Sequence, residues 1–238
     1  MRNKIIRWIK KEVAQARVKG VVLGLSGGVD SALVAALAKQ ALGKKRVLAL
    51  ILPCHSQQKD LADARLAAER LGLKTKTIDL SGIYDKLIQT LPAAKSLVQA
   101  NLKPRLRMSV LYYFANKLNY LVCGTGNKSE IKLGYFTKHG DGATDILPIG
   151  NLLKSEVRKL ARELKIPEEI IVKSPTAGLW PGQTDEGEMG ISYFELDDIL
   201  ERMENKESQI LSKKKVKKVK QMIKRSEHKR QGPKICYI

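Results

Sequence analysis

Residues 26–31, which read Ser-Gly-Gly-Val-Asp-Ser, combine hydroxyl groups, glycines and one acid in a pattern that suits phosphate binding. They follow an apolar run at 21–25 and precede a run of good helix formers at 32–38. This order predicts a buried strand, a tight loop and a buried helix. The first turn of such a helix offers unpaired backbone N–H groups and its positive dipole end to an anion. Gly27 and Gly28 let the backbone approach that anion closely, because neither residue carries a Cβ.

Three other kinds of loop share part of this pattern. A Walker-type loop needs a lysine before its final hydroxyl residue, and Asp30 stands there. A dinucleotide-binding fingerprint needs its second glycine where Ser26 stands. A hydrolase nucleophile elbow, G-x-S-x-G, matches residues 24–28 literally. That fold places strands before its nucleophile, however, and too few residues precede Ser26 to supply them.

The stretch instead resembles the S-G-G-x-D-S loop of the N-type ATP pyrophosphatases, or PP-loop enzymes. These enzymes bind the β,γ-pyrophosphate of ATP and cleave between the α and β phosphates. The resemblance implies that ATP is bound by Gly24, Leu25, Ser26, Gly27, Gly28, Val29, Asp30 and Ser31.

The first half of the chain alternates strand and helix patterns. The expected elements are an amphipathic N-terminal helix, strands at 46–52 and 73–80, a helix at 56–71, and a turn at Ser81–Gly82. Two successive strand–helix–strand units predict an α/β fold with a doubly wound parallel sheet flanked by helices. Ligands bind such sheets outside the carboxyl ends of the strands, which is where residues 26–31 lie.

The second half is expected to be mainly helical. Predicted elements are helices at 104–119, 154–164, 193–203 and 210–225, a short helix after Pro167, and a strand at 120–123 followed by a second glycine-rich turn at 124–130. Residues 92–103 show no clear pattern. Residues 174–190 lack periodicity and are expected to form a mobile loop.

Six segments, in this order along the chain, resemble those of the NAD synthetases. They are residues 24–31, 101–108, 124–130, 134–142, 174–177 and 227–230. The resemblance implies a single domain over residues 1–238 with the adenine nucleotide α-hydrolase-like fold and additional C-terminal helices. A large N-terminal glutamine amidotransferase domain, which glutamine-dependent relatives carry, is not expected.

The resemblance implies the last step of NAD biosynthesis, the amidation of deamido-NAD⁺ to NAD⁺. A carboxylate is a poor electrophile because its negative charge repels an incoming amine. The carboxylate of deamido-NAD⁺ therefore attacks the α-phosphorus of ATP, which releases pyrophosphate and leaves an acyl-adenylate. Ammonia, free or delivered by a separate glutaminase, then displaces AMP. Such chemistry needs positioning and charge neutralisation more than a protein nucleophile, so no covalent nucleophile is expected.

The same resemblance implies roles for individual residues. Thr125, Lys154 and Thr176 match positions that contact ATP, and Asp30 and Glu130 match ligands of Mg²⁺, which prefers hard oxygen donors. Without the resemblance, Asp30 would be interpreted as a carboxylate favoured by a helix N-terminus. Glu130 and Lys154 would be interpreted as solvated side chains.

The positions that match contacts to deamido-NAD⁺ are Arg105, Lys138, Asp145, His228 and Lys229. The resemblance also implies a homodimer whose dinucleotide site is shared between subunits. One departure is Gly178, which stands where many relatives have an acid, so no role follows for that position.

Composition limits the alternatives. The 44 basic and 24 acidic residues of this 238-residue chain give a formal charge of +20, which leaves open a PP-loop enzyme acting on tRNA. The basic tract at 213–220 reads as a solvated helix face without interleaved aromatic residues, so nucleic-acid binding is not the favoured interpretation. The scattered Cys54, Cys123 and Cys236 are expected to be reduced, buried thiols of a cytoplasmic protein without zinc. Neither a membrane span nor a signal peptide is expected.

Overall fold

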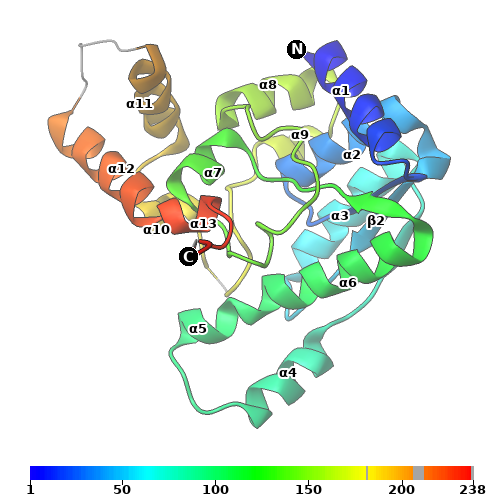
Figure 1. The fold of residues 1–238 in the computed structure, drawn as a ribbon, viewed down its shortest axis with the longest axis horizontal. Helices are drawn as coiled ribbons and strands as arrows, with labels where there is room; N and C mark the ends of the chain where they lie inside the picture. The colour runs from blue at the N-terminus through cyan, green and yellow to red at the C-terminus, as the bar shows by residue number, and fades with distance from the viewer. Residues whose placement is uncertain (181, 206–211, 237–238) are drawn as a thin grey trace.

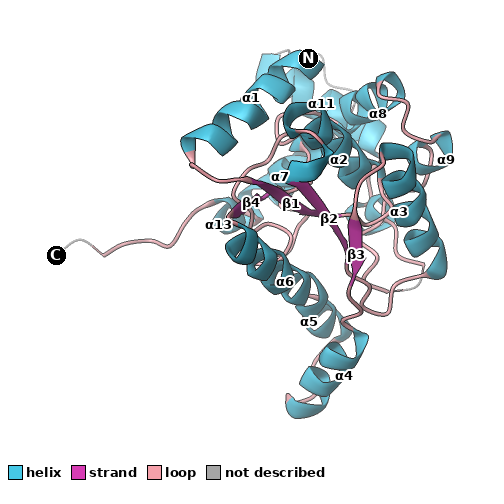
Figure 2. Cartoon of the chain, turned by 90° about the vertical axis from the view of Figure 1, so that its right-hand side faces the viewer, coloured by secondary structure: helices cyan, strands magenta, loops and turns pink. Residues whose placement is uncertain are grey.

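The structure, a computed structural model, describes residues 1–180, 182–205 and 212–236. Within them lies a parallel sheet of four strands in the order β3-β2-β1-β4 (Figure 2). The strands are β1 (Gly20–Gly24), β2 (Val47–Ile51), β3 (Thr75–Thr77) and β4 (Tyr120–Val122). The chain adds β2 and β3 on one side of β1 and then returns to place β4 on the other side. The switch point between β1 and β4 is where open parallel sheets bind ligands.

Helices cover both faces of the sheet. The helices of the described residues are α1 (Arg2–Gln15), α2 (Val29–Leu42), α3 (Gln58–Leu71), α4 (Ser81–Thr90), α5 (Ser96–Ala100), α6 (Leu102–Leu118), α7 (Lys128–Leu133), α8 (Lys154–Glu163), α9 (Glu168–Ile171), α10 (Asp185–Met189), α11 (Tyr193–Asn205), α12 (Lys213–Arg225) and α13 (Glu227–Arg230), with a 3₁₀ turn at η1 (Lys44–Arg46). Helices α2 and α3, with α1 and α8 beyond them, pack on one face. Helix α6 packs on the other face, against β1 and β4. The doubly wound parallel sheet is therefore confirmed.

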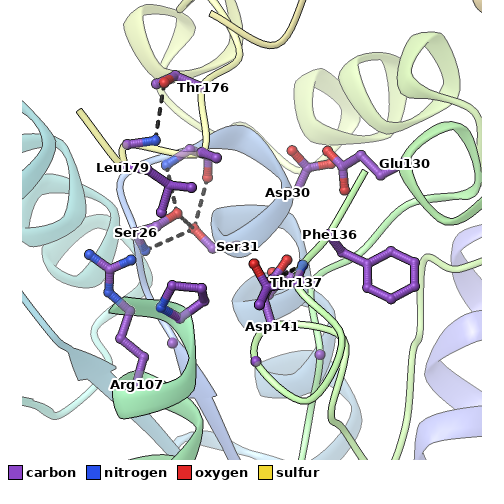
Figure 3. Close-up of a pocket in the computed structure, with 18 of the residues that line it drawn as sticks. Ser26, Asp30, Ser31, Arg107, Glu130, Phe136, Thr137, Asp141, Thr176 and Leu179 are labelled. Atoms are coloured by element: carbon purple, nitrogen blue, oxygen red, sulfur yellow. Dashed lines mark hydrogen bonds between the residues drawn. The ribbon is translucent and has the colours of Figure 1, made fainter. Parts of the chain in front are cut away.

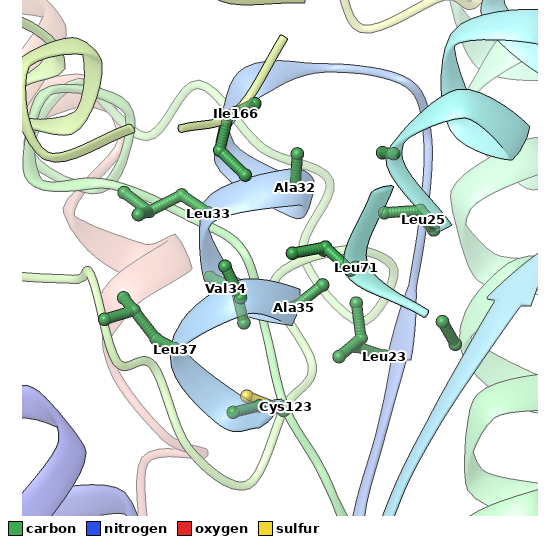
Figure 4. Close-up of a cluster of buried hydrophobic side chains, with 14 of the residues drawn as sticks. Leu23, Leu25, Ala32, Leu33, Val34, Ala35, Leu37, Leu71, Cys123 and Ile166 are labelled. Carbon is green, nitrogen blue, oxygen red and sulfur yellow. The ribbon is translucent and has the colours of Figure 1, made fainter. Parts of the chain in front are cut away.

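The core forms because β1 is apolar on both faces. Val21 and Leu23 point into the cluster under α2, whereas Val22 points into the cluster under α6. Helix α2 is buried along nearly its whole length, and its small side chains let it lie close to the strands (Figure 4). This packing fixes the start of α2 directly above the end of β1.

The C-terminal helices form a second, smaller core beside the sheet (Figure 1). Leu196 and Leu200 of α11 pack with Val219 of α12 and with Leu133 at the end of α7. Helix α7 starts from the turn after β4, so this layer is attached directly to the edge of the switch point.

Several local predictions differ from the structure. The strand predicted at 73–80 is reduced to β3, because all three residues of that edge strand are exposed. The turn predicted at Ser81–Gly82 instead begins α4, a helix without buried residues. Two short helices, α5 and α10, lie within the segments 92–103 and 174–190, where none was predicted. The helix predicted at 210–225 is found as α12, and residues 210–211 lie outside the described residues.

The three cysteines differ in burial. Cys54 and Cys123 are buried free thiols, as predicted, but the prediction is wrong for Cys236. Cys236 is exposed because the chain beyond α13 runs away from the core (Figure 2). None of the helices among the described residues is both long enough and apolar enough to cross a membrane.

Candidate active site

The loop between β1 and α2 presents a concave set of donors. The Ser31 hydroxyl donates to the Gly28 carbonyl oxygen at 2.9 Å and lies 3.1 Å from the Ser26 hydroxyl (Figure 3). The Ser26 N–H in turn donates to the Ser31 hydroxyl at 3.2 Å. Gly28 is the N-cap of α2 and supplies no side-chain cap, so the first N–H groups of that helix remain available to an anion.

Gly27 is required by both its conformation and its surroundings. Its φ of +83° lies in the left-handed region, which residues with a Cβ rarely adopt. A Cβ at this position would also lie 2.3 Å from the Asp60 carbonyl oxygen and 3.0 Å from the Asp63 Cβ. Helix α3 therefore supports the loop from behind, and only glycine fits between them.

A cavity of about 450 Å³ opens in front of this loop. It is bounded by the carboxyl ends of β1 and β2, one side of α6, the turn after β4 and the segment 173–179. The structure places the following predicted ATP contacts on its wall: Gly24, Leu25, Ser26, Gly28, Val29, Asp30, Ser31, Thr125, Lys154 and Thr176. Gly27 faces α3 instead. The cavity thus gathers residues from both halves of the chain at the switch point.

The turn after β4 is joined to the first loop by Asn127. The Asn127 side chain accepts a hydrogen bond from the Glu130 N–H at 3.0 Å, and a Glu130 carboxylate oxygen accepts one from the Asn127 N–H at 3.2 Å. This capping box fixes the start of α7. The same Asn127 amide donates to Asp30 Oδ1 at 2.9 Å. The carboxylates of Asp30 and Glu130 thereby lie side by side in the cavity (Figure 3).

Lys154 lies between these two carboxylates. Its Nζ is 2.5 Å from Asp30 Oδ2 and 3.3 Å from Glu130 Oε1, and the residue is only 2% exposed. Burial alone would lower the pKa of Lys154, but the charges of Asp30 and Glu130 raise it above its ordinary value. Burial raises the pKa of Glu130 to about 7, against the opposing effect of the Lys154 charge. The lysine therefore stays charged and holds the two acids together.

The donor set fits Mg²⁺. Asp30 and Glu130 offer carboxylate oxygens beside a loop suited to phosphate, and Mg²⁺ is held by one or two carboxylates together with substrate phosphates. Among the described residues there is no group of three His, Cys, Asp or Glu side chains that could hold a metal ion. A metal here would thus depend on a bound nucleotide for its remaining ligands.

The residues predicted to contact deamido-NAD⁺ divide into three sets. Lys229 lines the cavity and donates to the Gly134 and Phe136 carbonyl oxygens, each at 2.8 Å. Arg105, Lys138 and His228 lie outside the cavity wall but form one chain. An Arg105 guanidinium nitrogen donates to the Lys138 carbonyl oxygen at 3.3 Å, and Lys138 Nζ donates to the His228 carbonyl oxygen at 2.5 Å.

Asp145 is not brought together with the others. Its carboxylate accepts the Val122 N–H at 2.7 Å and the Tyr112 hydroxyl at 3.1 Å, which ties the loop after β4 to the sheet. A role of these five residues in substrate binding stays a prediction.

Sequence reasoning gave no role to several polar residues that line the cavity or support it, among them Arg107, Lys173, Asp185 and Tyr193. Arg107 lines the cavity and donates to the Leu52 carbonyl oxygen at 3.0 Å. Lys173 also lines it and is paired with Asp60 at 2.7 Å and with Asp63. The other two are Asp185 and Tyr193, which lie close to Glu130. Arg107 lies in a segment that carried the resemblance, whereas no local pattern marks the other three.

Cys54 and His55 follow β2 but do not form a catalytic pair. The Cys54 thiol faces the Leu80 carbonyl oxygen, and the His55 ring lies 2.7 Å from an Asp85 carboxylate oxygen. The interpretation of these residues as an ordinary loop is confirmed.

A parallel sheet with a Ser-Gly-Gly-x-Asp-Ser loop at its switch point, facing two carboxylates, defines an ATP pyrophosphatase of the PP-loop type. Comparison with known proteins narrows this class. The family model of NAD synthase matches residues 1–233, and the chain belongs to that family.

Relatives of this family match along the whole chain. The chain is 48% identical over 245 residues to the NH(3)-dependent NAD(+) synthetase of Methanosarcina acetivorans, covering 98% of this chain and 96% of the relative. Among solved structures, the NMN synthetase of Francisella tularensis superposes with a TM-score of 0.92 at 39% identity, covering 100% of this chain and 97% of that one. The NH3-dependent NAD synthetase of Campylobacter jejuni superposes with a TM-score of 0.87 at 34% identity, covering 99% and 97%.

Proposed function

We propose that this chain catalyses the ATP-dependent amidation of deamido-NAD⁺ to NAD⁺ with ammonia, releasing AMP and pyrophosphate. The observation that carries the proposal is the junction of the two glycine-rich turns, where Asn127 and Lys154 hold Asp30 and Glu130 beside the loop at 26–31. That junction can bind a triphosphate and neutralise its charge, and the proposed reaction is the one for which the NAD synthase family is named. Relatives named NH(3)-dependent support ammonia as the nitrogen donor.

The residues of the loop hold the leaving group. Ser26, Gly28 and Ser31 offer N–H and hydroxyl donors to the β,γ-pyrophosphate of ATP, which leaves the α-phosphorus exposed to the substrate carboxylate. Thr176, on the opposite wall, faces the same cavity. Because the protein only positions and neutralises charge, neither Ser26 nor Asp30 is assigned as a nucleophile or a base.

Asp30 and Glu130 would hold Mg²⁺ when ATP is bound. The ion would neutralise charge on the triphosphate as pyrophosphate leaves. Lys154 keeps both carboxylates in the cavity and accounts for one of their two negative charges. The nucleotide would bring the remaining oxygen ligands, as the two-carboxylate donor set requires.

We infer that the substrate carboxylate enters from the side of α6 and α13. Lys229 lines the cavity on that side, and Arg105, Lys138 and His228 form a hydrogen-bonded chain outside the cavity wall that continues from it. Apolar side chains are exposed on the adjacent helices, among them Ile83, Leu91, Leu97, Val98 and Tyr113. Figure 1 shows α4 and α5 projecting from the molecule, so a second copy would cover these side chains and complete the rim.

A second candidate substrate is nicotinic acid mononucleotide. The structural likeness to the Francisella tularensis NMN synthetase favours it, because that likeness extends over the whole chain. The chemistry at the carboxylate would be the same. Only the adenylyl half of the dinucleotide would be missing.

The substrates are distinguished by initial rates with ATP, Mg²⁺ and ammonium. We expect kcat/KM for deamido-NAD⁺ to exceed that for nicotinic acid mononucleotide by at least about tenfold, a difference of about 1.4 kcal/mol. A preference for the mononucleotide would assign the second candidate. Pyrophosphate release stimulated by bulk tRNA and by neither nucleotide would reject both.

A further inference from the structure

A third carboxylate, that of Asp185, lies behind the Asp30–Glu130–Lys154 cluster. Asp185 is the first residue of α10 and is only 4% exposed, yet it forms part of the cavity wall. Its Oδ2 accepts a hydrogen bond from the Tyr193 hydroxyl at 3.0 Å. Its Oδ1 is buried and has no hydrogen-bond partner in the structure. A buried carboxylate oxygen without a donor is costly, which suggests that the donor arrives with the ligand.

Tyr193 connects Asp185 to the cluster. The tyrosine is 1% exposed, and its hydroxyl oxygen lies 3.4 Å from Glu130 Oε1 as well as 3.0 Å from Asp185 Oδ2. The Lys154 ammonium lies 5.0 Å from the centre of its ring. A phenol has one proton to donate, and the shorter contact assigns it to Asp185. Tyr193 thus separates two carboxylates that would otherwise repel one another.

The cluster is rich in acids. Three carboxyl groups, those of Asp30, Glu130 and Asp185, are joined through Lys154 and Tyr193, and Lys154 is the basic side chain that contacts Asp30 and Glu130. Such an excess of acidic groups suits a divalent cation. Direct coordination by all three acids is not what the geometry offers, because the described residues contain no three-residue metal group.

We propose that Asp185 is an outer-sphere carboxylate of the Mg²⁺ site, accepting a hydrogen bond from a water on the ion and, through Tyr193, fixing the orientation of Glu130. Outer-sphere partners of this kind orient ligands and raise metal affinity. The proposal rests on the function proposed above. It also connects the metal site to Thr176, because the Asp185 N–H donates to the carbonyl oxygen of Pro175, the residue before Thr176, at 3.0 Å.

The test measures metal affinity without turnover. Mn²⁺ is titrated into the full chain saturated with the α,β-methylene analogue of ATP, and free Mn²⁺ is followed by electron paramagnetic resonance. Asp185→Asn keeps the size of the side chain and an acceptor for Tyr193 but removes the charge. Tyr193→Phe removes only the hydroxyl. Glu188→Gln is the matched control, because Glu188 lies on the same helix and cavity wall but bonds to Tyr135 and Gln183.

We expect Asp185→Asn to weaken Mn²⁺ binding by about 10–100-fold. Tyr193→Phe should weaken it less, and Glu188→Gln should bind as the wild type does. The affinity for the analogue measured without metal should stay unchanged in all three variants, which a general loss of folding would not allow. If Asp185→Asn misfolds, the Mn²⁺ affinity of Tyr193→Phe tests the proposal, and a melting temperature equal to that of the wild type shows that this variant is folded.

Unchanged Mn²⁺ affinity in Asp185→Asn and Tyr193→Phe would overturn the role of Asp185. An equal loss in Glu188→Gln would overturn it too, because the effect would then belong to the whole wall. Conversion of deamido-NAD⁺ by the wild-type preparation is measured in parallel. Its absence would refute the proposed function, whereas the Mn²⁺ series reports on Asp185 alone.

Discussion

Asp30 and Glu130 come from two separate strand–helix turns, and both contact the ammonium group of Lys154. A contact of this lysine with ATP stays a prediction, and in the structure its ammonium group lies between the two acids. When a nucleotide and its metal enter the cavity, Lys154 can exchange its contacts with the two acids for contacts with the phosphates. Charge balance at three residues is therefore the feature on which the chemistry depends.

Replacing Asp30 by Asn should reduce kcat for NAD⁺ formation by at least about 100-fold, since changes to residues that only support metal ligands already cost about 10–100-fold in metal sites. The amide cannot supply the negative charge that Mg²⁺ and Lys154 both require. Initial rates at saturating ATP measure the effect. The control is Asp79→Asn, an exposed carboxylate that contacts Ser81 and is expected to leave the rate unchanged. Equal rates for Asp30→Asn and the wild type would contradict the assignment.

Glu130 should make the stability of the metal-free and nucleotide-free protein depend on pH. Its pKa is raised from 4.5 to about 7 in the folded protein because the carboxyl is buried. Between these two pKa values the folded state binds more protons than the unfolded state. The contribution of Glu130 to the free energy of unfolding is therefore fully present below about pH 4.5 and is lost as the pH rises through about 7. Glu130→Gln removes that loss.

We therefore expect Glu130→Gln to melt higher than the wild type at pH 8 and to differ little from it at pH 4.5. One pKa unit is worth about 1.4 kcal/mol, and about 1 kcal/mol shifts the melting temperature of a chain this size by roughly 2–4 °C. Thermal melts across this pH range give the comparison. A lower melting temperature for the variant at pH 8 would show that the ionised pair with Lys154 outweighs the burial of Glu130.

At the level of elements, the loop at 26–31 depends on α3 behind it. Gly27→Ala should lower the melting temperature and abolish turnover, because the left-handed conformation alone costs about 1–2 kcal/mol and the new Cβ would meet the Asp60 carbonyl oxygen at 2.3 Å. Gly28→Ala is the matched control for stability. Its φ is −94° and its nearest neighbour would be the Ser26 hydroxyl at 3.5 Å. Similar melting temperatures for the two variants would contradict this account.

Elements with a strong local pattern could be predicted from the sequence. The apolar runs of β1 and β2 and the helix formers of α2 predicted the phosphate loop, because all three elements are buried on both sides. Helix α4 could not be predicted in the same way, since none of its residues is buried and its first turn reads Ser-Gly. Asp185 and Tyr193 were missed because their link to Glu130 depends on the fold. Tyr193 contacts a residue 63 positions earlier in the chain, and Asp185 is joined to that residue through Tyr193. Such contacts leave no trace in a local pattern.

At the level of the whole molecule, two layers meet at the switch point. The sheet supplies the phosphate loop, and the C-terminal helices supply Asp185, Tyr193 and Lys229. The first layer was predicted from strand and helix patterns. The second was expected only as helices, because the way α11 and α12 dock on α7 depends on tertiary packing that periodicity does not specify.

The exposed apolar side chains on α4 and α5 predict self-association. We expect the wild type to be a dimer and a double variant, Ile83→Asp with Val98→Asp, to be a monomer, because two charges would be buried at the proposed interface. Light scattering after size exclusion measures the mass. The control is Phe194→Asp, an even more exposed apolar residue on α11, which is expected to leave the mass unchanged. A wild-type protein that is monomeric at micromolar concentration would refute the proposal that a second copy completes the substrate site.

The acyl-adenylate is tested most directly by oxygen transfer. Deamido-NAD⁺ carrying ¹⁸O in its nicotinate carboxylate is converted with ATP, Mg²⁺ and ammonium, and the products are analysed by mass spectrometry. Attack of the carboxylate on the α-phosphorus predicts one ¹⁸O in the phosphate of AMP, with pyrophosphate unlabelled and NAD⁺ formed in equal amount. Release of ADP, or AMP without ¹⁸O, would contradict the mechanism.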